Sequence, residues 1–160
     1  MAVFLRKILG IGELPDDMRA QVEAEGMLHL AEFVAVTFRF SGKVPGKTAK
    51  GNLRSYVGAL VLTNERVLGT LSSVPKKAGR AVDHPWNAKG GSMVQATLDE
   101  SGLLLAVPDI SVIDPSFSGS VSLHYKAPLS EDVLTRLPQR SFAFDAPPKF
   151  IYTACGVPQR

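Results

Sequence analysis

Apolar and polar residues alternate along most of this chain. Residues 56–73 hold two runs rich in Val, Leu and Thr, which flank a polar break at 63–66. β-Branched residues suit a pleated surface, and Asn tolerates the backbone angles of a tight turn. The pattern therefore predicts a β-hairpin with strands at about 53–62 and 67–73.

The longest alternation precedes this hairpin, at 28–40, where the even positions are mostly apolar. A period of two with one apolar face predicts a half-buried strand. Glu32 interrupts the apolar face, which predicts that the strand starts after it or bulges there. Residues 41–52, with three Gly, one Pro and three Lys, are predicted to form a loop.

Shorter alternating segments predict the remaining strands. We expect a strand near 81–86, a second hairpin with strands at 93–98 and 103–107, and a seventh main strand at 118–126. Phe142 and Phe144 alternate, as do Phe150 and Tyr152, so both pairs are predicted to lie in short extended segments. Trp86 is predicted to fill one end of the sheet assembly.

Two short helices are predicted beside these strands. The first covers 15–26, where Pro15 suits a first turn and Gly26 is a natural stop. Its apolar stripe is thin, so we expect it to lie on the surface of the sheet. The second covers 130–137, with Ser130 as its N-cap and Pro138 as its end.

Seven strands in meander order, followed by a helix, resemble the plan of the pleckstrin-homology-like (PH-like) barrel. The segment Leu-Thr-Asn-Glu-Arg-Val-Leu at 62–68 resembles a hairpin common in bacterial PH-like and GRAM-type domains, and 3–10 resembles the start of small bacterial members. This resemblance covers about 27–137 and implies a binding scaffold rather than an enzyme. It departs from the family at Pro138, which ends a helix that is long in other members.

The predicted fold class is therefore mainly β: a PH-like antiparallel barrel of about seven strands, with a short N-terminal helix and a short helix after the last main strand. A length of 160 residues fits one domain. We divide it into an N-terminal arm and helix (1–26), the barrel with its helix (27–137) and a C-terminal extension (138–160).

The bulk composition is that of a globular protein, with 45% hydrophobic and 21% charged residues. The single cysteine, Cys155, excludes a disulfide within the chain and fits a reducing compartment. Arg6 and Lys7 split the apolar start, which is not typical of a signal peptide. The predicted location is cytoplasmic, with peripheral contact to a membrane as an option.

Basic residues are concentrated in one part of the chain. Residues 33–82 carry nine bases against a single acid, Glu65. In a meander, the loops after the first and third strands lie at the same end of the sheet. The predicted anion-binding site therefore comprises Lys43, Lys47, Lys50, Arg54, Lys76, Lys77 and Arg80. Such a cluster attracts an anionic lipid surface or an acidic partner protein; nucleic acid is not expected, because aromatic residues are not interleaved with the bases.

No motif predicts catalysis, a cofactor or a metal. The histidines, His29, His84 and His124, lack metal-ligand spacing, and no Gly-x-Ser-x-Gly segment is present. Asp83 and His84 are adjacent on a predicted strand and point to opposite faces, so Asp83 is not expected to orient His84. We predict a non-enzymatic binding module; the alternatives are a structural subunit of a homo-oligomer and a small hydrolase that uses His84 or His124.

Overall fold

A computed structural model describes residues 13–71, 79–88 and 91–155. Eight strands form one antiparallel sheet in the order β4-β3-β2-β1-β7-β6-β5-β8. The strands are β1 (Met27–Val44), β2 (Lys47–Thr63), β3 (Arg66–Leu71), β4 (Gly79–Pro85), β5 (Val94–Asp99), β6 (Gly102–Val107), β7 (Ser118–Lys126) and β8 (Ser141–Phe144). The helices are α2 (Asp16–Ala24), the 3-10 helix η1 (Ile110–Val112), α3 (Glu131–Arg136) and α4 (Pro148–Cys155).

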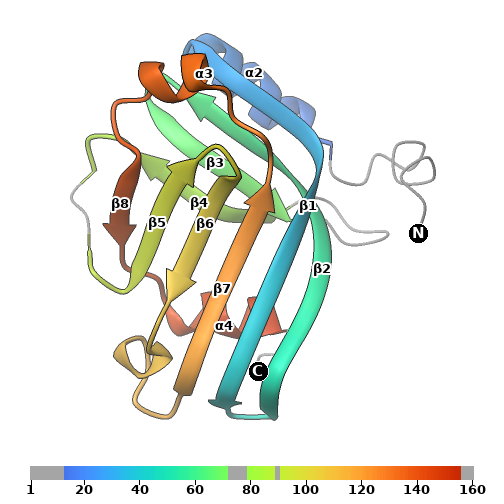
Figure 1. Cartoon of the computed structure of the whole chain (residues 1–160), viewed down its shortest axis with the longest axis vertical. Helices are drawn as coiled ribbons and strands as arrows, with labels where there is room; N and C mark the ends of the chain where they lie inside the picture. The colour runs from blue at the N-terminus through green and yellow to red at the C-terminus, as the bar shows by residue number, and fades with distance from the viewer. Residues whose placement is uncertain (1–12, 72–78, 89–90, 156–160) are drawn as a thin grey trace.

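The sheet curls into a nearly closed barrel (Figure 1). β1 and β2 are long and bent, so that they belong to both sides of the barrel. β1 pairs with β2 along one edge and with β7 along the other, and β7, β6, β5 and β8 continue the front of the sheet. The mainly β barrel predicted from the alternating pattern is confirmed.

Two predictions from the sequence are wrong. Residues 41–52 are not a loop, because β1 and β2 pair as far as Val44 and Lys47, and the turn holds only Pro45 and Gly46. Two of the three glycines that suggested a loop lie within the strands, Gly42 in β1 and Gly51 in β2, and Gly51 has a φ of 63° beside a register shift. Phe150 and Tyr152 are not extended either, since they lie in α4, where Pro148 occupies a first-turn position that suits it.

A small second core lies on the outside of the barrel, between α2 and the β2–β3 region. Leu14, Met18 and Val22 pack there against residues of the sheet, namely Leu30, Ala59, Val61 and Leu68. Glu32 of β1 binds the start of this helix. Its Oε2 accepts from the backbone N–H of Leu14 at 2.8 Å and from Arg19 Nη2 at 2.7 Å. The bulge predicted at Glu32 is present as a register shift between Ala31 and Val34.

The main core fills the barrel and brings its two sides into contact. Tyr125 on β7 is fully buried and donates to the backbone oxygen of Thr70 on β3 at 2.9 Å. Gly69 leaves room for this ring, because an added Cβ there would lie 3.0 Å from it. Burial raises the pKa of the Tyr125 phenol far above its ordinary range, so the group is neutral.

The remaining elements close the barrel. β8 extends the sheet beside β5, and its Phe142 stacks on His84 of β4 with ring centroids 4.7 Å apart. Trp86 is buried and donates from its indole N–H to the Thr63 oxygen at 2.8 Å. α4 lies at the lower end in Figure 1, where Tyr152 contacts the buried Phe117.

Candidate binding surface on the β1–β2 arm

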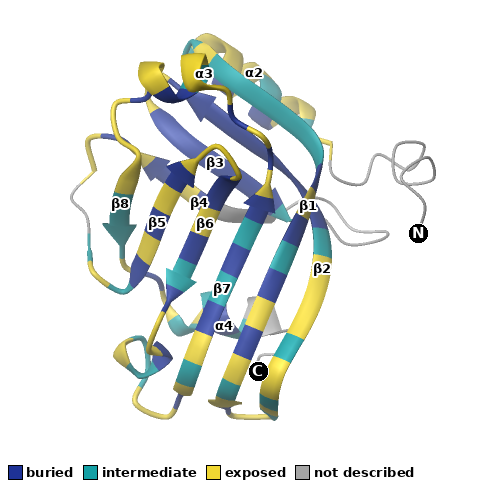
Figure 2. Ribbon diagram, viewed as in Figure 1, coloured by how far each residue is buried: buried dark blue, intermediate teal, exposed yellow. Residues whose placement is uncertain are grey.

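The lower part of the β1–β2 hairpin extends past β3, as Figures 1 and 2 show. β3 pairs with β2 only at Leu60–Leu62, whereas β1 pairs with β2 over its whole length. We call the segment 39–54 the basic arm. It contains Arg39, Lys43, Lys47, Lys50 and Arg54, and no acidic residue.

The bases of this arm are divided between two faces of the sheet. Directly opposed residues of antiparallel strands point to the same face. Arg39 opposes Ser122, and Lys43 opposes Ser118, so these pairs share the outer face. Arg54 opposes the buried Phe38 and therefore lies on the inner face, where β3 no longer covers it and its side chain is exposed. The arm is thus positively charged on both sides.

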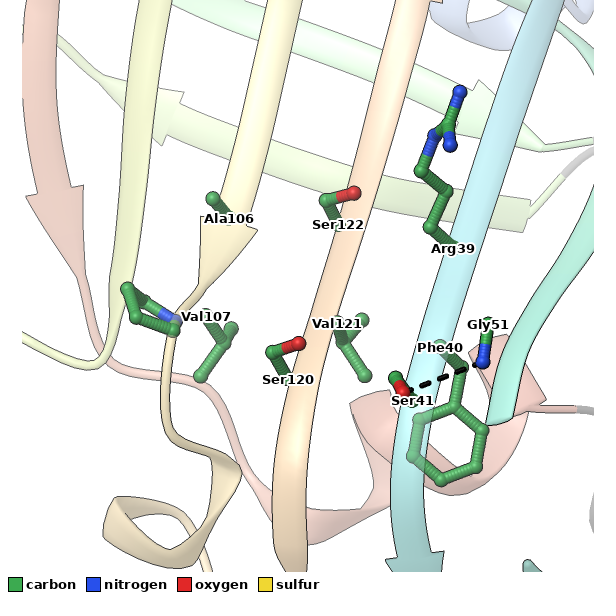
Figure 3. Close-up of a pocket in the computed structure, with 10 residues that line it drawn as sticks. Arg39, Phe40, Ser41, Gly51, Ala106, Val107, Ser120, Val121 and Ser122 are labelled. Carbon is green, nitrogen blue, oxygen red and sulfur yellow. Dashed lines mark hydrogen bonds between the residues drawn. The ribbon is translucent and has the colours of Figure 1, made fainter. Parts of the chain in front are cut away.

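The outer face of the arm contains a shallow hollow of about 350 Å³ (Figure 3). Arg39 lies at one side of it, and three serine side chains are part of its lining: Ser41, Ser120 and Ser122. Ser41 Oγ accepts from the backbone N–H of Gly51 at 3.3 Å, which leaves its own proton available to donate. A guanidinium beside hydroxyl donors is chemistry that suits a carboxylate or phosphate group.

Two carboxylates belong to the connection between β6 and β7, which begins at the hollow with Pro108. Asp109 follows Pro108, which lines the hollow, and Asp114 comes later in the same connection. Asp109 accepts from the Ser111 hydroxyl at 2.6 Å, and Asp114 accepts from the backbone N–H of Ser116 at 2.8 Å. These bonds to serine lower the pKa of both carboxyls, so both stay ionised.

The seven bases predicted as a site do not all lie in one place. Lys43, Lys47 and Lys50 are together near the tip of the arm, and Arg54 lies further along β2. Arg80 is described by its backbone, which pairs with Thr70 most of the length of β2 away from the tip. Lys76 and Lys77 lie outside the described residues.

Arg66 shows the contrasting, structural use of a base in this fold. It is buried and bound by two carboxylates: its Nη1 lies 3.0 Å from Asp83 Oδ1, and its Nη2 lies 2.8 Å from Glu25 Oε2. Thr63 Oγ1 also donates to Glu25 at 3.0 Å. This cluster joins the end of α2 to the β2–β3 turn and to β4, and its charge is already neutralised.

The histidines that a hydrolase would use lie apart from the basic arm. His84 stacks on Phe142 of β8 and lies beside Phe144, while Asp83 binds Arg66. His124 Nε2 lies 3.2 Å from Ser101 Oγ, and that hydroxyl donates to Asp99 at 2.5 Å. The serine therefore stands between acid and histidine, which is not the order of a nucleophilic triad, where histidine stands in the middle.

Within the described ranges, no group of three His, Cys, Asp or Glu residues is placed to hold a metal ion. None of the helices described is both long and apolar enough to cross a membrane. The chain matches no protein-family model, no curated protein and no solved structure. The resemblance of residues 62–68 to PH-like domains therefore stays a prediction.

Arg39 and the serines of β7 were not predicted from the sequence as parts of a surface. Their signal is the same period of two that predicted the strands: Arg39, Ser41 and Lys43 alternate with buried or half-buried residues on β1, as Ser118, Ser120 and Ser122 do on β7. The polar face of each strand therefore carries a signal for these residues, as the apolar face does for the core. That these two rows are adjacent follows only from the pairing of β1 with β7.

Proposed function

We propose that this protein is a non-enzymatic binding module that recognises an anionic partner through the basic arm. The observation that carries this proposal is the arm itself: five bases and no acid on a hairpin that extends past the neighbouring strand. Arg39, Lys43, Lys50 and Arg54 are exposed, and none of them has an ion-pair partner among the described residues. The hollow beside Arg39 offers hydroxyl donors for one oxyanion of that partner.

The charge pattern of the rest of the molecule supports the same proposal. Four bases elsewhere in the described chain are bound to acids: Arg19 to Glu32, Arg66 to Glu25 and Asp83, Arg136 to Asp132, and Arg140 to Glu131. A base without a neighbouring acid contributes fully to the local potential and to the attraction of an anion. The partner is either a membrane rich in anionic lipid or an acidic protein segment.

The test is co-sedimentation with vesicles of phosphatidylcholine alone or mixed with phosphatidylserine, together with binding of polyglutamate, at about 50 mM and about 200 mM salt, since screening differs strongly between them. We expect binding to at least one anionic probe, weaker at the higher salt, and none to the neutral vesicles. The triple variant Lys43→Glu, Lys50→Glu and Arg54→Glu should abolish binding.

A matched control carries the same change of net charge elsewhere: Lys126→Glu, Arg136→Glu and Arg140→Glu, all at exposed positions. This control should retain most of the binding, because its reversed charges lie outside the arm. Equal loss in the two triple variants would show that net charge alone matters. Absence of binding to both anionic probes would overturn the proposed function.

A further inference from the structure

The basic arm has a free strand edge in addition to its charge. β2 pairs with β1 from Lys47 to Thr63. On its other edge, the backbone of β2 pairs with β3 only at Leu60–Leu62, and Ala59 bonds to a side chain of β3. In Figure 1 the lower part of β2 forms the right margin of the front sheet, and Figure 2 shows most of that part as exposed. A strand edge of this kind presents unpaired N–H and C=O groups to which another strand can bind.

The direction of these backbone groups follows from one hydrogen bond. The N–H of Ala59 donates to Thr70 Oγ1 of β3, so the groups of Ala59 point away from β1. The register of β2 with β1 is regular from Gly58 to Asn52, and in a strand every second residue points its N–H and C=O to the same side. Leu53 and Ser55, which are both exposed, therefore present their backbone groups at the free edge, and no hydrogen bond within the described part of the chain occupies them on that side.

The side chains along this edge select the partner. Lys50 and Arg54 are exposed there without an acid nearby on the strand, and Leu53 is 57% exposed. A second copy of the chain added along the same edge would bring the same bases against them, and like charges on paired strands are destabilising. Edge lysines are a common protection against such self-pairing. An acidic strand, by contrast, is complementary in charge.

We propose that an extended acidic segment of a partner protein adds to the sheet along β2, at Leu53 and Ser55. This inference rests on the proposed function and specifies its partner. Because Arg54 and Leu53 point to opposite faces, the segment that fits best alternates acidic residues, which face Arg54, with apolar residues, which face Leu53. The main-chain hydrogen bonds supply affinity, and the alternation supplies specificity.

The experiment uses two probes that differ only in their backbone. One is a labelled ten-residue peptide that alternates Glu with Val, and the other is the same peptide N-methylated at its four central residues. Both carry the same charge, but the second cannot donate from its central amides to a neighbouring strand. We expect the first to bind the whole protein in fluorescence anisotropy, and the second to bind at least tenfold more weakly. On binding of the first, hydrogen exchange should slow at the amides of Leu53 and Ser55.

Two variants at one position test the site on the protein. Ser55→Pro removes an edge N–H and leaves the side of the strand that pairs with β1 intact, so it should abolish peptide binding; Pro is tolerated at strand edges. Ser55→Ala keeps the N–H and should bind like the original protein. Circular dichroism of Ser55→Pro checks that it folds, and if it does not, the two peptides still decide the question on the unaltered chain.

Each other outcome has a defined meaning. Equal binding of the two peptides would overturn strand addition and leave the proposed function, since charge alone would then explain binding. Binding to anionic vesicles without binding to either peptide would also overturn strand addition and identify a membrane surface as the partner. Failure of both peptides, polyglutamate and the vesicles to bind would overturn both proposals.

Discussion

The two halves of β2 belong to the same strand but have opposite surroundings. From Val57 to Thr63 every residue is buried, because α2 covers the outer face and the barrel core covers the inner face. From Lys47 to Tyr56 every residue is exposed or half-buried. The register with β1 continues through both halves. Pairing with one neighbour is therefore enough to form the strand, and what covers its faces decides whether a given stretch stabilises the fold or stays available to a partner.

The sharpest test of this difference compares one leucine from each half. Leu60 is fully buried, and Leu53 is 57% exposed. We expect Leu60→Ala to reduce the free energy of unfolding by about 2–5 kcal/mol, because it leaves a cavity in the main core. Leu53→Ala should change it by less than about 0.5 kcal/mol. Urea denaturation followed by fluorescence of Trp86 measures both, and similar losses would contradict the division of β2.

Charged residues offer the second comparison. Arg66→Met leaves Glu25 and Asp83 without their base, and breaking a buried ion pair typically costs 3–5 kcal/mol. Asp83 keeps a quarter of its side chain exposed, so water partly replaces Arg66, and we expect a loss of about 2–3 kcal/mol. Lys50→Met on the arm should stay within about 0.5 kcal/mol. A loss below about 1 kcal/mol for Arg66→Met, measured by the same denaturation, would show that the cluster is solvated.

Two glycines of β2 are required for different reasons, one because of a steric clash and the other because of its backbone conformation. A Cβ at Gly58 would lie 1.9 Å from the backbone oxygen of Thr70, so Gly58→Ala should cost about 1–3 kcal/mol through overpacking. Gly51 has open space around it but a φ of 63°, so Gly51→Ala should cost about 1 kcal/mol from the left-handed backbone alone. Gly51→Asn tests this reason, because Asn tolerates that conformation and should recover part of the loss. No recovery would contradict the conformational account.

We expect a smaller change in the free energy of unfolding when the pH is lowered, and it comes from two buried or half-buried histidines. Burial lowers the pKa of both His84 and His29 below the ordinary value of 6.5. The unfolded chain therefore takes up protons before the folded protein does, so the free energy of unfolding should be constant above about pH 6.5 and fall as the pH drops toward the folded pKa values.

Urea denaturation at pH 7.5 and 5.5 measures this fall, in a range where carboxylates contribute little. His84→Gln and His29→Gln should each reduce the difference between the two pH values. An equal free energy of unfolding at pH 7.5 and 5.5 in the original protein would contradict the claim that burial lowers the pKa of these histidines.

The strands were predictable from the sequence because burial of one face imposes a period of two on the residues that form it. That pattern identified β1, β3, β5, β6 and β7 to within a few residues, and the capping residues at Ser130 and Pro138 identified α3. It underestimated the β1–β2 hairpin, because the arm has no continuous apolar face and its glycines resemble those of a loop. A strand can be predicted from its sequence when it buries apolar side chains, and the arm buries few.

The candidate surface was predictable only in part. The excess of bases between 33 and 82 is visible in the sequence, and the structure places Lys43, Lys47, Lys50 and Arg54 on one hairpin. Other properties of the bases depend on residues distant in sequence. Glu25 and Asp83 neutralise the charge of Arg66. The pairing of Arg39 with Ser122 determines which face of the sheet Arg39 occupies.

Local properties of the chain, such as alternation, caps and charge, thus specified the kinds of element and their approximate positions. The tertiary structure decided the rest: that β3 ends before it covers the lower half of β2, that α2 covers the upper half, and that β7 places its serines beside Arg39. These are contacts between segments far apart in the chain, and their free energy depends on how the whole sheet curves and closes. No window of neighbouring residues contains that information.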